Sequence, residues 1–181
     1  MTPEVVLRTY FRAKDENRPH LLADVFTAGA ELVIRNQSEN IAFPAFTRGR
    51  AAIAEVLVRS FALAYENVYS FYLARPMPGI HEFACPWLVA MSERSSAGRV
   101  RAGCGTYEWS FDPDDAHRAN RLVVAIDAMQ VLPPTESERV FAWLRTLDYP
   151  WSSPEAVLKT MPACELLSPI VRFLERHATV V

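Results

Sequence analysis

The sequence predicts an α+β fold in which helices cover one face of a curved antiparallel sheet. Three segments with helical spacing of apolar residues precede most of the strand segments. The stretch 99–131 is typical of one long β-hairpin, and further helical stretches follow it. Helices and strands that are segregated along the chain in this way favour an α+β layer over alternating β/α units.

The predicted hairpin is the centre of the sheet. Its first arm alternates between two faces, one of which carries Gly103, Gly105, Tyr107, Trp109 and Phe111. The second arm is apolar and β-branched except for Asp127, which we expect on the concave face together with Val123, Ala125 and Met129. A carboxylate in a buried strand either has a partner or lines a cavity, because an unpaired buried charge is too costly. The glycines at 103 and 105 are expected to let the sheet bend.

The remaining N-terminal elements follow from capping residues and periodicity. Thr2 and Pro3 predict the start of a helix that runs to about Glu16. Its apolar side is predicted to hold Val6, Leu7, Tyr10, Phe11 and Ala13, with Arg8, Arg12, Lys14 and Asp15 turned largely to water. A second helix is expected from Pro19 until Gly29, followed by a strand at 30–37, an irregular stretch at 38–47 and a third helix at 50–66. Strands are expected at 68–75 and 83–93.

The last quarter of the chain is predicted to be helical. Pro133 and Pro134 end the sheet, and helical patterns follow at about 135–147, from 153 onward and at 163–177. We therefore predict a domain over 1–132 and a helical C-terminal extension over 133–181. The extension carries many apolar residues, so it is expected to pack on the domain.

Composition narrows the function classes. With 181 residues, 22% charged residues and a net charge of -2, the chain predicts one core and no basic stripe for nucleic acid. The N-terminus lacks a basic region followed by an apolar run, and no stretch is long enough to span a bilayer, so a cytoplasmic protein is expected. The three cysteines are interpreted as free thiols, and the four scattered histidines do not indicate a metal site.

Four segments carry a resemblance to a known family: TYFRAKDENRPHLLADVF, GAELVI, RGRAAIAEV and RLVVAIDAMQV. In this order they resemble the nuclear transport factor 2-like superfamily, with its cystatin-like fold, and especially its SnoaL-like and ketosteroid isomerase-like branches. The resemblance covers roughly residues 1–132 and implies a cone-shaped domain that encloses a pocket. It also implies a homodimer through the outer sheet face, for which an apolar strip of Val124, Ile126 and Ala128 is expected to face outward.

The resemblance carries over residue by residue only in part. Tyr10 falls where ketosteroid isomerases have their oxyanion-hole tyrosine, whereas the positions of their base and second acid are Ile34 and Tyr107 here. Their two-acid mechanism is therefore not expected. Asp127 falls where SnoaL-like cyclases place an aspartate on the last strand.

These observations leave two functional hypotheses. The first is a cofactor-independent isomerase, cyclase or dehydratase acting on an apolar carbonyl or polyketide-like compound, with Asp127 as base and Tyr10 and Tyr107 as hydrogen-bond donors. The second is a ligand-binding or protein-interaction member of the same superfamily without catalysis. In either case the predicted ligand contacts are Trp109, Phe111, Met129, Ile34 and Trp87. The sequence does not distinguish these residues from ordinary core residues.

Overall fold

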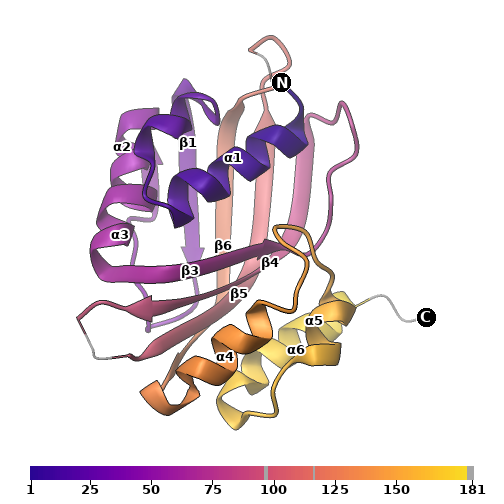
Figure 1. Ribbon diagram of the computed structural model, residues 1–181. Helices are drawn as coiled ribbons and strands as arrows, with labels where there is room; N and C mark the ends of the chain where they lie inside the picture. Colours follow the sequence, from indigo (N-terminus) through magenta and orange to yellow (C-terminus); the bar gives the residue numbers. More distant parts are fainter. Residues whose placement is uncertain (96–97, 116, 179–181) are drawn as a thin grey trace.

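A six-stranded curved sheet organises the molecule in the computed structural model, which describes residues 1–95, 98–115 and 117–178 (Figure 1). Its strand order is β2-β1-β6-β5-β4-β3. The strands are β1 Phe26–Asn36, β2 Phe46–Arg48, β3 Tyr65–Tyr72, β4 Glu82–Glu93, β5 Val100–Phe111 and β6 Ala119–Leu132. The α+β class and the long β5–β6 hairpin are confirmed, while β2 lies in a stretch that was expected to be irregular.

One pairing departs from the expected antiparallel sheet. β1 and β6 run parallel, with Val33 opposite Val123, whereas the other neighbouring strands pair in antiparallel fashion. The alternation within a strand shows which residues share a face, but it does not reveal the partner or its direction. The sheet is therefore mixed.

Helices α1 Pro3–Asp15, α2 Arg50–Ala54 and α3 Ser60–Ala64 lie over one face of the sheet, which we call the inner face (Figure 1). A π-helical turn, Glu55–Arg59, joins α2 to α3. The Thr2 side chain caps α1 by accepting a hydrogen bond from the Val5 amide at 3.4 Å. The predicted second helix is only a 3-10 turn, Pro19–Ala23, and Gly29 lies inside β1. Gly29 does not end a helix because it lacks the positive φ of a helix-terminating glycine.

The C-terminal segment packs on the opposite, outer face of the sheet. Its helices are α4 Ser137–Leu144, α5 Pro154–Thr160 and α6 Ser168–His177. They form a second hydrophobic cluster with the outer side chains of β3, β4, β5 and β6. The Tyr72 amide donates to the Pro150 carbonyl at 2.9 Å, and the Ser152 amide donates to the Tyr72 carbonyl at 2.9 Å, which ties the segment to the edge of β3. The segment thus lies against the outer face of the sheet, and the division of the chain at Pro133 stays a prediction.

A β-bulge in β6 changes which residues face inward. Cys104 pairs with Ala128 and Gly105 pairs with Ile126, so Asp127 has no opposite residue. Residues opposite each other in an antiparallel pair share a face, and Tyr107 lies opposite Val124.

The face predicted for the part of β6 before the bulge was therefore wrong, whereas the faces predicted for Ala128 and Met129 after it are correct. Val124 and Ile126 lie on the inner face, and the bulge brings Met129 back to the same side. Of the strip that was predicted to face outward, only Ala128 does so, whereas Val124 and Ile126 face inward. The strip therefore does not support the homodimer, which itself stays a prediction. The alternation predicted for β5 is confirmed. Tyr107, Trp109 and Phe111 pack in the hydrophobic cluster on the inner face of the sheet, whereas Ala102 and Cys104 pack in the cluster on its outer face.

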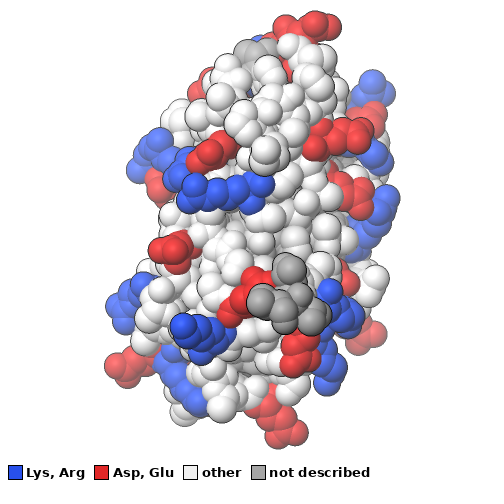
Figure 2. All heavy atoms as spheres, turned by 90° about the vertical axis from the view of Figure 1, so that its right-hand side faces the viewer, with Lys and Arg blue, Asp and Glu red and all other residues white. Residues whose placement is uncertain are grey.

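The surface carries charges of both signs. On the face shown in Figure 2, basic and acidic side chains are interspersed rather than gathered by sign. Within the described residues, no helix combines the length and apolar character needed to cross a membrane.

Candidate functional site

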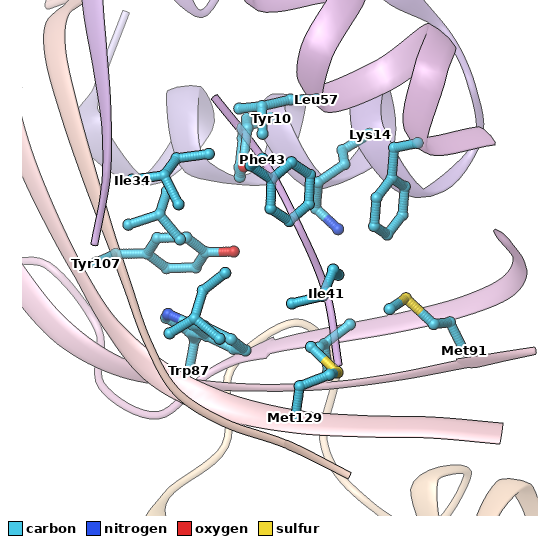
Figure 3. A pocket seen from close by; sticks show the side chains of 14 residues that line it. Tyr10, Lys14, Ile34, Ile41, Phe43, Leu57, Trp87, Met91, Tyr107 and Met129 are labelled. Carbon is cyan, nitrogen blue, oxygen red and sulfur yellow. The ribbon is translucent and has the colours of Figure 1, made fainter. Parts of the chain in front are cut away.

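A small cavity of about 50 Å³ lies between the inner face of the sheet, the helices and the segment after β1 (Figure 3). It is bounded by Tyr10, Lys14, Ile34, Ile41, Phe43, Leu57, Phe61, Trp87, Val89, Met91, Tyr107, Val124, Ile126 and Met129. Most of this lining is aliphatic or aromatic, and no carboxylate or imidazole is among the described residues that form it. The cavity therefore suits an apolar molecule, with a few polar groups to orient it.

Lys14, Tyr107 and Tyr10 are among the residues that supply those polar groups. The Lys14 amine and the Tyr107 hydroxyl point into the same space from opposite sides, and Tyr10 lies beside them (Figure 3). Tyr10 and Lys14 are one helical turn apart on α1, and Tyr107 comes from the middle of β5. The two tyrosine rings meet edge to face, with their centroids 6.1 Å apart. The site thus combines one cation with two neutral donors.

Lys14 belongs to a buried polar network behind the cavity. Its Nζ contacts Asp15 Oδ1 and donates a hydrogen bond to Ser70 Oγ at 2.9 Å. Ser70 Oγ in turn donates to Asp15 Oδ1 at 3.0 Å. The side chains of Lys14 and Asp15 are only 7% and 5% exposed, so this ion pair is shielded from solvent. The second carboxylate oxygen, Asp15 Oδ2, is buried and has no hydrogen-bond partner within the described residues.

The prediction that Lys14 and Asp15 face water was wrong. Lys14 follows Leu7, Tyr10 and Phe11 at spacings of seven, four and three residues, which places it on the apolar stripe of α1. Its amine also lies 5.0 Å from the ring centroid of Phe61, where the aromatic face attracts a cation. The periodicity of α1 contains this signal, because the position of Lys14 on the apolar stripe decides the side to which it points.

Burial governs the protonation of the groups around the cavity. It raises the pKa of Tyr10, and the charge of Asp15 raises it further, so that the hydroxyl stays protonated as a donor. Burial likewise raises the pKa of Tyr107. Burial also raises the pKa of Asp15, although the neighbouring Lys14 ammonium opposes this effect. A carboxyl whose pKa is raised is better able to accept a proton near neutral pH.

The other sequence-predicted site residues divide into two groups. Ile34, Trp87 and Met129 line the cavity as expected, together with Tyr10 and Tyr107. Trp109 and Phe111 do not line it. Trp109 is 1% exposed and stacks with Phe111 at 6.1 Å between ring centroids, so these two rings belong to the packed core.

Asp127 also lies away from the cavity. It is half-buried at the bulge of β6. Burial raises the pKa of the Cys104 thiol, the charge of Asp127 raises it further, and Arg176 on α6 opposes this effect. Cys104 and α6 both belong to the outer side of the sheet. The structure therefore brings Tyr10 and Tyr107 together but not Asp127, because the expected alternation did not anticipate the true register of β6.

A neighbouring groove adjoins the cavity. It has a volume of about 240 Å³ and shares Ile41, Phe43 and Phe61 with the cavity lining. The Asn36 side chain donates a hydrogen bond to the Ile41 carbonyl at 2.5 Å, which helps to hold the intervening segment in place. Pockets for drug-sized ligands measure roughly 300–1,000 Å³. The cavity alone therefore fits a small compound, and a larger one requires Ile41 and Phe43 to move aside.

Metal binding has no evident donor set. In the part of the chain that the structure describes, no three His, Cys, Asp or Glu side chains gather closely enough to hold a metal ion. The chemistry that the cavity offers is instead the stabilisation of negative charge on an oxygen, through an ammonium group and hydroxyl donors in an apolar setting.

Comparisons with solved structures identify the fold. A nuclear transport factor 2-like superfamily protein from Salmonella enterica serovar Typhimurium superposes with a TM-score of 0.56 and 15% identity, over 69% of this chain and 88% of that chain. TerC, co-crystallised with polyporic acid, superposes with a TM-score of 0.53 and 10% identity, over 68% of this chain and 89% of that chain. The type 2 hexachlorocyclohexane dehydrochlorinase LinA superposes with a TM-score of 0.51 and 13% identity, over 71% of this chain and 84% of that chain. The predicted nuclear transport factor 2-like fold is confirmed.

Sequence comparisons add little. No family model matches the chain. An O-acetyl-ADP-ribose deacetylase from Cronobacter turicensis is 34% identical over 80 residues, which are 41% of this chain and 42% of that protein. The chain thus spans less than half the length of this relative. An alignment of that extent does not transfer an activity.

Proposed function

We propose that this chain, which has the nuclear transport factor 2-like fold, binds a small apolar compound in the inner cavity through one oxygen atom. Lys14, Tyr10 and Tyr107 would contact that oxygen, and the aliphatic and aromatic lining would enclose the rest of the molecule. The carrying observation is the lysine amine in an otherwise apolar cavity beside two tyrosine hydroxyls. A carboxylate, a phenolate or an enolate has the charge that suits this arrangement.

The ion pair with Asp15 makes such binding energetically reasonable. An isolated buried ammonium is very costly, but Asp15 and Ser70 already compensate Lys14 on the side away from the cavity. An ammonium has three hydrogens, so one remains for a ligand after these two contacts. The fold itself accommodates organic molecules, as the TerC structure with polyporic acid illustrates for that protein.

Catalysis is the second candidate function. An isomerase, cyclase or dehydratase reaction needs a proton acceptor as well as an oxyanion site. No carboxylate lies among the described residues of the lining, so Asp127 is not a suitable base. The observation that favours catalysis is Asp15, whose buried carboxyl has a raised pKa and contacts the Lys14 amine. A proton could pass from the cavity to Asp15 through Lys14.

Binding can be tested with two compounds of equal chain length, butanoate and butan-1-ol. We expect butanoate to bind more tightly than butan-1-ol in ligand-observed NMR, because only the carboxylate pairs with the ammonium. Lys14→Met should weaken butanoate binding by roughly 10- to 100-fold, the equivalent of the ~1.5–3 kcal/mol of a charged hydrogen bond. Butan-1-ol binding should change little.

Lys159 provides the matched control. It is exposed on α5, away from the cavity, so Lys159→Met removes the same charge without touching the lining. Its butanoate affinity should equal that of the parent. Equal losses in the Lys14 and Lys159 variants, or no butanoate binding by the parent, would contradict the proposal.

A further inference from the structure

Lysine is rare in this chain. Of its 19 basic residues, only Lys14 and Lys159 are lysines, and all the others are arginines. Lys159 is exposed, whereas Lys14 lines the inner cavity. A guanidinium is the better group for a purely structural ion pair, because it forms a rigid fork and stays charged. An amine differs chemically in that it becomes a nucleophile when it loses a proton.

The surroundings of the Lys14 amine favour that chemistry. Nζ lies 5.0 Å from the Phe61 ring centroid and 5.7 Å from that of Phe11, so water has little access to it. Asp15 contacts the amine directly and has a buried oxygen, Oδ2, without a hydrogen-bond partner in the described chain. The oxygen in contact with the amine, Oδ1, is the acceptor for a proton of the ammonium. The Tyr107 hydroxyl points into the same space as the amine (Figure 3).

We propose that Lys14 forms an imine with a small apolar aldehyde or ketone held in the inner cavity. This inference rests on the proposed function and narrows its ligand to carbonyl compounds. It gives Lys14 a covalent role, with Asp15 as proton acceptor and Tyr107 as hydrogen-bond donor to the carbonyl oxygen.

The step balances without an oxidant or reductant. The Lys14 ammonium passes one proton to Asp15, and the freed lone pair forms a bond from Nζ to the carbonyl carbon. The π electrons of the carbonyl move to its oxygen, which the Tyr107 hydroxyl stabilises. A proton moves from the nitrogen to that oxygen, which gives a carbinolamine. Asp15 then returns its proton to the hydroxyl as the carbon–oxygen bond breaks, and one water molecule leaves. The nitrogen–carbon double bond remains, and addition of water reverses the sequence.

Reductive trapping tests this inference on the intact protein. The folded chain is incubated with butanal and sodium cyanoborohydride, which reduces an imine to a stable secondary amine, and peptide mass spectrometry then locates the added butyl group. The chain offers Lys14, Lys159 and the N-terminal amine for this reaction. We expect Lys14 to be labelled roughly tenfold faster than Lys159, or more, because binding holds the carbonyl beside its amine. In the denatured chain the two lysines should react at similar rates.

Two controls separate the imine from ordinary binding. Butanoate occupies the same oxygen site but forms no imine, so it should slow the labelling of Lys14 and leave Lys159 unaffected. Lys159→Arg removes the exposed lysine outside the cavity, so butanoate binding and the labelling of Lys14 should both be retained.

The outcomes distinguish the two proposals. Preferential, butanoate-sensitive labelling of Lys14 supports imine formation. If Lys14 reacts no faster than Lys159 while butanoate still binds, the imine proposal is overturned and the proposed function stands. If butanoate does not bind and Lys14 shows no preference, both are overturned.

Discussion

Gly105 offers a sharp test of how tightly the sheet is packed at its bulge. A Cβ at this position would lie 1.9 Å from the Ala125 carbonyl oxygen and 2.8 Å from Cζ2 of Trp87. Ordinary Cβ contacts begin at 3.4 Å, so the strands would have to separate by more than an ångström. The closest atom belongs to the backbone of β6, which cannot rotate away as a side chain can. Gly105→Ala should therefore lower the free energy of unfolding by about 3 kcal/mol, the upper part of the usual range for overpacking.

For a chain of this size, such a loss corresponds to a decrease in Tm of roughly 6–12 °C. Denaturant unfolding followed by tryptophan fluorescence, together with calorimetry, measures both quantities. The matched control is Gly29→Ala in β1, where an added Cβ would meet nothing within 4 Å. That variant should stay within about 0.5 kcal/mol of the parent. Equal stabilities of the two variants would refute the inference that β6 leaves no room at position 105.

Four further predictions follow from burial and position. Trp151→Ala removes a ring that stacks on Tyr72 at 4.9 Å, so the free energy of unfolding should fall by about 3–5 kcal/mol, and a loss below about 1 kcal/mol would contradict this packing. Asp127→Asn should leave butanoate binding by NMR unchanged, because Asp127 lies outside the cavity lining; weaker binding would refute that placement. A thiol reagent should modify half-exposed Cys164 long before Cys104, because burial raises the pKa of the Cys104 thiol to about 12, and peptide mapping detects the order. Burial raises the pKa of Tyr10 above its usual 10.0, so above pH 10 the unfolded chain releases a proton that the folded protein keeps, and stability should fall as pH rises; an absorbance titration that finds every tyrosine ionising near pH 10 in the folded state would exclude this.

Periodicity predicted much of the fold. The apolar stripe of α1 and the alternation of β5 were readable because each depends on neighbours within the same segment. The face of β6 was not readable in this way. One unpaired residue at the bulge, Asp127, reverses the side to which every later residue points. Bulges and parallel partners depend on contacts with distant strands, and a single sequence does not display them.

The candidate site was predicted only in part for a related reason. Tyr10 and Tyr107 were placed correctly, because the resemblance and the alternation both pointed inward. Lys14 was missed because a charged residue is usually solvated, and its buried partners Asp15 and Ser70 come from two different elements. Trp109 was assigned to the pocket since core and cavity wall have the same composition. Only packing distinguishes the two.

The parallel pairing of β1 with β6 has a consequence for how the chain folds. Val33 and Val123 pair although α2, α3 and four strands, β2 to β5, lie between them in the sequence. During synthesis β1 therefore cannot pair with β6 until most of the chain has emerged from the ribosome. Closing so long a loop carries an entropic cost before any contact repays it, which slows folding. The inner apolar surface stays open during this interval, so the nascent chain is most vulnerable to aggregation just before β6 arrives.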